Sequence, residues 1–162
     1  MSSFNATRVS YEYTQTNDAS PDTVFPLLCP VREADWVPGW KYRMVYSESG
    51  VTEDGCVFTT PNDRGSETVW IVTHYDPAHF NISYAWIVPG MIATQIRIAL
   101  SSTGDGKTAA RIHYAYTGLS AAGNAILESY TNEWFREKMK GWEKAINQYL
   151  AKGKLMDTAA GE

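Results

Sequence analysis

Few residues in this chain are of the types that perform acid–base or metal chemistry. The sequence has three histidines, His74, His79 and His113, and two cysteines, Cys29 and Cys56. Acid–base catalysis needs a titratable side chain that reaches a bound substrate, and His74 is the clearest candidate because it lies in a predicted strand. A histidine without a partner group is more often structural than catalytic. We therefore predict no catalytic residue.

Metal and cofactor sites are not indicated either. A zinc site needs three or four ligands in workable geometry, whereas the histidines and cysteines are scattered along the chain. Glu33 and Asp35 lie in a broken segment, where we expect them to be solvated or to cap a short helix. The stretch "GDGKT" resembles a phosphate loop but lacks the Walker spacing and joins two strands, which is typical of a turn. We therefore predict no metal ion and no cofactor.

Tyrosines and tryptophans are the distinctive residues, with 10 and 6 copies among 162 residues. Five tyrosines, Tyr11, Tyr13, Tyr84, Tyr114 and Tyr116, share one predicted face of a sheet. A buried phenol without a hydrogen-bond partner costs about 1–3 kcal/mol, and few inward polar groups could pair with five of them. Water or a ligand in an internal pocket is the easier partner, although any single ring could belong to a plainly packed core.

The elements that position these side chains follow from the periodicity of the sequence. Ser20 is a plausible N-cap for a short helical segment over 19–28, and Pro21 fits its first position. A period of 3.6 over 121–150 predicts one amphipathic helix about 45 Å long. Alternation of apolar and polar residues predicts seven strands, at 8–16, 42–49, 56–60, 67–75, 79–88, 91–102 and 108–118. Hairpin-connected strands are antiparallel, so we predict a curved α+β sheet with one face covered by the helix.

The turns between the strands allow the register to be estimated. They pair Trp70 with Tyr84, Tyr84 with Thr94, and Thr94 with Tyr116. All three estimates place the same alternate residues on the helix-facing side. On the helix, Met139, Trp142 and Ile146 are predicted core, and Trp134 is predicted to face the cavity. The predicted ligand contacts are Trp36, Trp70, His74, Tyr84, Trp86, Thr94, Ile96, Tyr114, Tyr116, Trp134, Phe135 and Met139.

Three stretches resemble the START-like superfamily (SRPBCC), which includes polyketide cyclases, lipid-transfer START domains and the major birch pollen allergen. They are "SPDTVFPLLCPVREADWVPGW", "GDGKTAARIHYAYTGLS" and "NAILESYTNEWFREKMKGWEKAINQYL", and the likeness covers residues 8–152. The resemblance implies a helix-grip fold, in which a seven-stranded antiparallel sheet grips a long C-terminal helix around a deep apolar cavity. It also implies that two short helices within 20–40 close the end of the sheet beside the cavity mouth.

Two tryptophans would then lie near the entrance. Trp40 adjoins the second strand, and we predict that it is a buried anchor. Trp36 sits among Arg32, Glu33 and Asp35, so we predict a rim residue with one side of its ring exposed and in contact with the ligand.

We predict a single START-like ligand-binding domain over 1–152 and a flexible tail over 153–162. The formal net charge is −4 without a cluster of lysines and arginines, which argues against nucleic acid as a partner. No apolar run of 18 residues and no signal peptide occur, so we expect no integral membrane contact and a cytoplasmic protein.

The function that we expect is binding or carrying a hydrophobic or aromatic small molecule, lipid-like or polyketide-like, in the internal cavity. The first alternative is an enzyme of the polyketide cyclase, aromatase or dehydratase type that uses the same cavity, with a tyrosine or histidine supplying a proton. The second is a protein-interaction module of the same fold. A weak homodimer is left open.

Overall fold

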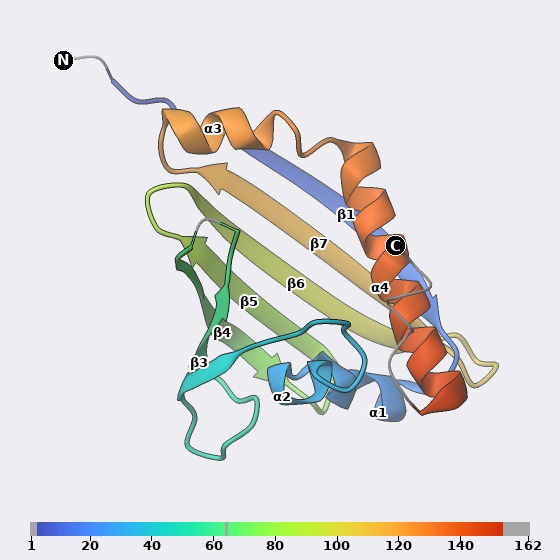
Figure 1. Cartoon of the computed structure of the whole chain (residues 1–162). Coiled ribbons are helices and arrows are strands. Elements are labelled where there is room, and N and C mark those ends of the chain that lie inside the picture. The colour runs from blue at the N-terminus through green and yellow to red at the C-terminus, as the bar shows by residue number, and fades with distance from the viewer. Residues whose placement is uncertain (1–2, 64, 154–162) are drawn as a thin grey trace.

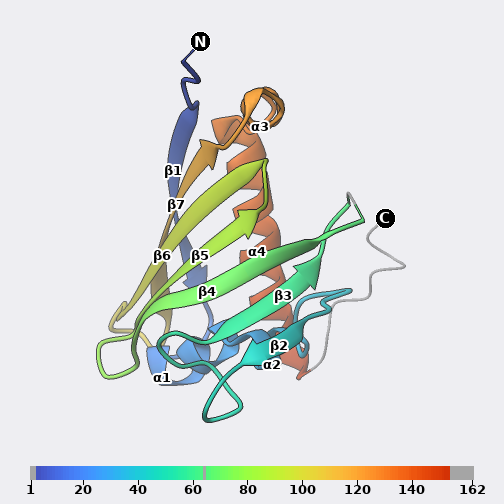
Figure 2. The same cartoon turned by 90° about the vertical axis from the view of Figure 1, so that its left-hand side faces the viewer.

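Residues 3–63 and 65–153, the part of the chain that the computed structural model describes, contain a seven-stranded antiparallel sheet. Its order is β1-β7-β6-β5-β4-β3-β2, so all neighbours except β1 and β7 are consecutive in the chain. Figure 2 shows how the sheet curves. The strands are β1 Arg8–Asn17, β2 Arg43–Tyr46, β3 Val57–Pro61, β4 Glu67–Asp76, β5 Asn81–Val88, β6 Ile92–Ser102 and β7 Thr108–Gly118.

Short helices lie at both ends of the sheet, and a long one lies along it. In Figure 1, α1 and α2 lie at one end, α3 lies at the other, and α4 runs between them. We call the sheet face that α4 covers the inner face and the opposite one the outer face. The helical elements are α1 Pro21–Val24, the 3₁₀ turn η1 Phe25–Leu28, α2 Pro30–Glu33, α3 Ala121–Leu127 and α4 Asn132–Lys152. The predicted helix-grip arrangement is confirmed.

The prediction of one continuous helix over 121–150 is wrong, because the chain leaves the helix at 128–131. Thr131 is the N-cap of α4, and its hydroxyl accepts a hydrogen bond from the Trp134 amide at 3.1 Å. The break frees the Tyr130 carbonyl from the helical pattern, and the Tyr11 hydroxyl donates to it at 2.6 Å. The junction between α3 and α4 is therefore fastened to β1.

The register agrees with the sequence estimate in one hairpin and differs by two residues in two others. Thr94 pairs with Tyr116 as predicted. Trp86 pairs with both Trp70 and Thr94, where the estimate had placed Tyr84. Because side chains alternate with a period of two, a shift of two residues leaves Trp70, Tyr84 and Trp86 on their predicted face.

The core lies between the inner face and α4. Met139 and Ile146 have no exposed surface, which confirms their predicted burial, whereas Trp142 is half-buried. The Glu143 carboxylate accepts from the Tyr13 hydroxyl at 3.2 Å and from the Thr16 amide at 2.6 Å, which fastens α4 to β1. Of the predicted tail, only Gly153 is described, and it caps α4 in the left-handed conformation.

Candidate functional site

Aromatic rings form a continuous network over the inner face. Trp70 stacks on Phe58 with a centroid distance of 5.4 Å and lies 6.0 Å from Trp86. Trp86 lies 6.2 Å from Tyr116, which in turn lies 5.5 Å from Tyr114. The predicted site residues that share this face are Trp70, Tyr84, Trp86, Thr94, Ile96, Tyr114 and Tyr116. The structure therefore brings the strand part of the predicted site together, while contact with a ligand stays a prediction.

The residues predicted on the helix divide into two groups. Phe135 and Met139 have no exposed surface and belong to the core, where Phe135 meets the ring of Tyr114 at 5.3 Å. Trp134 is half-buried and stacks on Tyr130 with a centroid distance of 4.0 Å. Trp134 and Tyr130 thus cover the inner face at the end of the molecule where α3 lies.

Three of the five inward tyrosines already have protein partners, so the expectation that they need a ligand is wrong for them. Tyr11 donates to the Tyr130 carbonyl and Tyr13 to Glu143. Tyr84 donates to the backbone carbonyl of Leu28. Burial raises the pKa of the Tyr84 phenol well above its ordinary value, so this phenol remains a donor at neutral pH.

Two other hydroxyls on the inner face are buried without a partner. Thr94 is 1% exposed and Tyr116 is fully buried, and neither side-chain oxygen has a hydrogen bond within the described residues. They are neighbours in the β6–β7 ladder. Burial raises the pKa of the Tyr116 phenol, so it remains protonated. Each unpaired group costs about 1–3 kcal/mol, and the pair therefore marks a place where a polar ligand atom would be stabilised.

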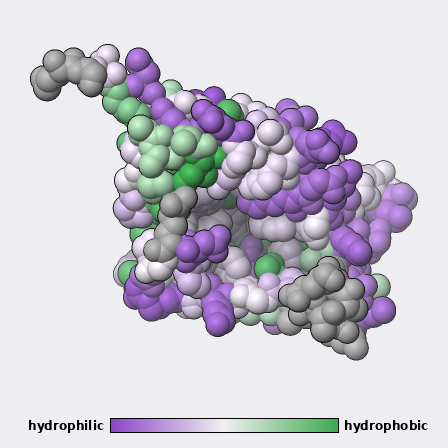
Figure 3. All heavy atoms as spheres, turned by 45° about the horizontal axis from the view of Figure 1, so that its top comes forward, coloured by the Kyte–Doolittle hydropathy of each residue, from purple (hydrophilic) through white to green (hydrophobic). Residues whose placement is uncertain are grey.

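An open pocket lies one ring away from these hydroxyls, at the α3 end of the molecule. Its volume is about 470 Å³, within the usual range for small-molecule sites. Figure 3 shows this end of the molecule, which is hollowed beside a patch of apolar side chains. Trp86 and Tyr130 separate the pocket from Tyr116, with centroid distances to Tyr116 of 6.2 and 5.1 Å. The residues that line the pocket are Asn62, Asp63, Trp86, Val88, Met91, Ile92, Ile126 and Tyr130. We call it the mouth pocket.

The entrance predicted within 20–40 is instead closed, and Trp36 is not a rim residue. Trp36 has no exposed surface, its indole N–H donates to the Leu27 carbonyl at 2.7 Å, and its ring meets Trp142 edge-on at 5.6 Å. Trp40, the predicted anchor, is only half-buried. The assignment fails because the charged neighbours of Trp36 in sequence do not surround it in space.

Glu33, which we expected to be solvated, lies at the closed end of the molecule, where α1 and α2 are found (Figure 1). Glu33 is 8% exposed, and its carboxyl group has no hydrogen bond or ion pair to another described residue. It lines an internal cavity of about 10 Å³ together with Leu28, Tyr84 and Trp142, which is close to the minimum space for one water molecule. Burial raises the pKa of Glu33 to about 8. This carboxyl group is therefore protonated at neutral pH.

Lys138 is a second titratable group that sequence reasoning missed. Its ammonium lies 5.2 Å from the ring centre of Tyr114 and 5.3 Å from that of Trp134, where the ring faces attract a cation. The side chain is half-buried, and desolvation lowers the pKa of this amine to about 8. The spacing of Trp134, Lys138 and Trp142 at four residues is the signal that could have placed all three on one face of α4.

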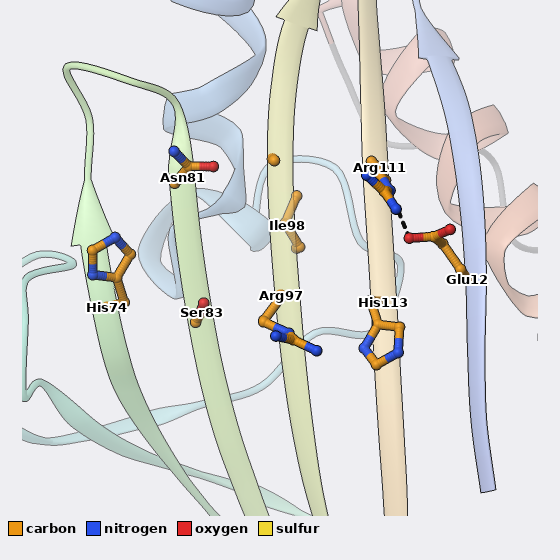
Figure 4. Close-up of a pocket in the computed structure, with 9 residues that line it drawn as sticks. Glu12, His74, Asn81, Ser83, Arg97, Ile98, Arg111 and His113 are labelled. Atoms are coloured by element: carbon orange, nitrogen blue, oxygen red, sulfur yellow. Dashed lines mark hydrogen bonds and ion pairs between the residues drawn. The ribbon is translucent and has the colours of Figure 1, made fainter.

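His74 does not point into the space between the inner face and α4, which we call the grip. Its predicted place on the inner face is therefore wrong. The β4–β5 register shifts between Val72 and His74, so His74 pairs with Ser83 and Tyr75 takes the next inward position opposite Ile82. A β-bulge of this kind moves every later side chain to the other face. His74 is exposed on the outer face, beside Ser83 and Arg97 (Figure 4).

Metal binding finds no support among the described residues. Within 3–63 and 65–153, no three or more histidines, cysteines, aspartates and glutamates are grouped to hold a metal ion. Cys29 and Cys56 are both free thiols. In the same part of the chain, no helix is long and apolar enough to cross a membrane.

A curved seven-stranded antiparallel sheet around a long C-terminal helix, with short helices after the first strand, is the helix-grip fold that the resemblance in sequence predicted. Comparison with solved structures confirms that this chain has that fold. No protein-family model and no curated protein matches the sequence.

Three similar structures illustrate the range of proteins with this fold. Ara h 8.0201 is 17% identical, with a TM-score of 0.64 over 90% of this chain and 99% of that chain. Norcoclaurine synthase from Thalictrum flavum, in complex with dopamine and hydroxybenzaldehyde, is 15% identical, with a TM-score of 0.66 over 92% and 90%. DynU16, from the dynemicin biosynthetic locus, is 18% identical, with a TM-score of 0.60 over 90% of this chain and 48% of that chain. These identities establish a common fold and no common activity.

Proposed function

We propose that the protein binds an aromatic small molecule that carries a hydrogen-bonding group, and that the molecule enters through the mouth pocket. The observation that carries this proposal is the pair of buried, unpaired hydroxyls of Thr94 and Tyr116, since Tyr116 contacts two rings that line that pocket. A hydroxyl or carbonyl oxygen of the ligand placed between them would satisfy both groups. The surrounding rings supply the apolar and edge-to-face contacts that an aromatic ligand prefers.

The ligand must displace side chains to reach the two hydroxyls. The free space at the closed end is about 10 Å³, whereas the mouth pocket has about 470 Å³. Trp86 and Tyr130 stand between the mouth pocket and Tyr116. In our proposal the body of the ligand occupies the mouth pocket, and rotation of one of these two rings admits its polar end. Aromatic rotamer changes of this kind are common on ligand binding.

Phenols are the first probes, because dopamine and hydroxybenzaldehyde, held by the similar norcoclaurine synthase structure, are both small phenols. Native mass spectrometry of the purified protein shows whether a small molecule is retained. Isothermal titration calorimetry with the two phenols and with a panel of fatty acids and sterols then tests binding. We expect saturable binding of one aromatic molecule per chain.

The Tyr116→Phe variant distinguishes a ligand-binding site from an ordinary packed core. Without ligand, removing a buried unpaired hydroxyl should raise the free energy of unfolding by about 1 kcal/mol. The affinity for the phenol should fall by about tenfold or more, as expected for the loss of one buried hydrogen bond. Tyr13→Phe is the matched control, because its hydroxyl is bonded to Glu143 and its loss should leave binding unchanged. Equal affinity in wild type and Tyr116→Phe, or no saturable binding of any probe, would refute the proposal.

A second candidate function, an enzyme of the cyclase or aromatase type, is favoured by Glu33 and Lys138. Both groups lie inside the grip with a pKa of about 8, and a general acid or base is most effective with a pKa near the working pH. Perturbed pKa values also mark many catalytic sites. Turnover of a bound ligand that is lost in Glu33→Gln or Lys138→Met, with binding retained, would support this candidate over a carrier.

A further inference from the structure

The outer face of the sheet carries a row of polar side chains in cross-strand register. Each residue of the row is the register partner of the next one on the neighbouring strand, so the row runs perpendicular to the strands. From β1 to β4 it consists of Glu12, His113, Arg97, Ser83 and His74. Figure 4 shows these side chains on the same side of the sheet, with Arg97 next to His113.

The outer face is hollowed around this row. Two adjoining concavities, of about 430 and 290 Å³, share His74, Ser83 and Arg97. Small residues account for the hollow, because Ala99 and Ala85 lie on its floor beside Ser83. The bulge in β4 adds His74 to one side of it. We call the two concavities together the outer groove.

Positive charge in the outer groove is not fully neutralised. Glu12, the carboxylate that lines it, accepts from Arg111 at 2.6 Å. The nearby Asp76 pairs with His79 at 2.7 Å in the β4–β5 turn. The guanidinium of Arg97 makes no hydrogen bond or ion pair with any residue in 3–63 and 65–153. The groove thus presents a free guanidinium on a chain with a formal net charge of −4.

The pKa of His113 reflects the positive charge of Arg97 beside it. Partial burial and then the charge of Arg97 lower the pKa of the His113 imidazole, against a smaller opposing effect of Glu12. An anion bound at Arg97 would offset the charge of Arg97 and raise the pKa of His113 again. The ring signals of His113 would therefore report binding directly.

We infer that the outer groove binds the phosphate group of a small molecule, with Arg97 at its centre. A guanidinium offers paired N–H donors that match an oxyanion, and His113 and Ser83 are its neighbours on either side. Strands are about 4.8 Å apart, so these three side chains can surround one phosphate. His74 and Asn81 lie one position farther out and would contact the rest of the molecule. This site is separated from the mouth pocket by the thickness of the sheet.

Histidine NMR tests the inference, because the sequence has only three histidines. The probe is inorganic phosphate, with acetate as a comparison for a singly charged carboxylate. We expect phosphate to shift the ring signals of His113 saturably and those of the more distant His74 less, with a midpoint on the order of 1 mM, as for a few charge-assisted hydrogen bonds. His79, which lies in the turn and is paired with Asp76, should respond much less.

Two arginine variants decide the outcome. Arg97→Gln should weaken phosphate binding by about tenfold or more, whereas Arg43→Gln, which removes the same charge on β2, should leave it unchanged. Unsaturated shifts, equal shifts of all three histidines, or equal loss in both variants would overturn the inference, and tighter binding of acetate than of phosphate would overturn the assignment to phosphate. Phenol binding in the grip should be the same in Arg97→Gln and wild type, so this test and that of the proposed function fail separately.

Discussion

Glu33 differs from an ordinary surface carboxylate in its protonation state. It belongs to the four-residue helix α2, and it lines a small cavity together with Tyr84 and Trp142 at the closed end of the grip. A charged carboxylate there would be desolvated without a partner. The favourable state is therefore the protonated one, and its dominant cause is burial.

The free energy of unfolding should fall as the pH rises through the neutral range. In the unfolded chain the Glu33 carboxyl loses its proton near pH 4.5, whereas in the folded protein it keeps the proton up to about pH 8. The contribution of this group is therefore fully present below about pH 4.5 and is lost progressively up to about pH 8. At about 1.4 kcal/mol per pH unit, the loss at pH 7 is about 3 kcal/mol. Glu33→Gln cannot ionise, so it should be more stable than wild type at pH 7, as measured by chemical denaturation.

The control for this prediction is Asp35→Asn, which removes an exposed carboxylate two positions along the chain. A surface ion pair contributes about 0–1 kcal/mol, so this variant should follow the pH dependence of the wild type. If Glu33→Gln also follows the wild type between pH 5 and about 8, the carboxyl is charged in the folded state and the assignment is wrong.

The sequence could not have identified Glu33, because its neighbours Arg32 and Asp35 are typical of an exposed helix. Only the tertiary fold, which places Glu33 in one cavity lining with Trp70 and Tyr84, turns this side chain inward. The inner-face tyrosines could be identified, since alternation is a local property and survives an error of two residues in register. Their partners could not, because the Leu28 and Tyr130 carbonyls that accept from Tyr84 and Tyr11 belong to distant elements.

At the scale of elements, the two tryptophans after α2 have exchanged their predicted roles. Trp36 is the buried anchor, and Trp40 is the less buried of the two. Trp36 belongs to a small cluster with Leu27, Ala145 and Ile146, which joins η1 to the last turns of α4. Trp40 donates its indole N–H to the Pro30 carbonyl at 2.8 Å and meets Trp70 edge-on at 6.4 Å. Trp36 thus fixes the segment to α4, and Trp40 rests on the sheet.

Substitution of the two tryptophans should separate these contacts. Trp36→Ala should lower the free energy of unfolding by about 3–5 kcal/mol, the usual cost of removing a fully buried large ring. Trp40→Ala should cost about 1–3 kcal/mol, because that ring is only half-buried. Trp36→Phe should lie between the two, since it keeps a ring against Trp142 but loses the bond to Leu27. A larger loss for Trp40→Ala than for Trp36→Ala in urea denaturation would contradict this order.

Element boundaries were predictable where local turn chemistry decided them, and not elsewhere. The glycines of "TGDGK" adopt positive φ angles, and the β6–β7 register that this turn implies is correct. The β4–β5 turn instead places the non-glycine Phe80 at a φ of 57°, and the bulge before His74 has no local sequence signal. The break before α4 depends on Thr131 acting as an N-cap, which competes with an otherwise uninterrupted helical pattern.

For the whole molecule, the two ends of the grip differ. The α2 end is closed by Trp36, Trp142 and Glu33, and the α3 end holds the mouth pocket. Contact between α3 and the β5–β6 turn is exceptionally close at Gly123, where a Cβ atom would lie 1.8 Å from the Met91 carbonyl oxygen. The Leu119 amide also donates to that oxygen at 2.8 Å, which holds the carbonyl in place. Gly123 therefore determines how closely α3 covers the mouth pocket.

Gly123→Ala should loosen the α3 end without disturbing the closed one. Alanine at this position must displace α3 from the turn, because the clash is with backbone atoms and not with a flexible side chain. The amides of α3 should then exchange hydrogen faster, while those of α4 near Trp142 remain protected. If ligands enter here, association of a phenol should be faster in this variant, as measured by stopped-flow fluorescence.

Gly141→Ala is the matched control, since it makes the same chemical change in a helix. A Cβ atom at Gly141 meets nothing within 4 Å, so the substitution should stabilise α4 by about 0.5–1 kcal/mol through the higher helix propensity of alanine. The two variants are therefore expected to change stability in opposite directions, and only Gly123→Ala should change the association rate. Equal association rates in wild type and Gly123→Ala, despite faster exchange in α3, would mean that the ligand does not pass between α3 and the β5–β6 turn.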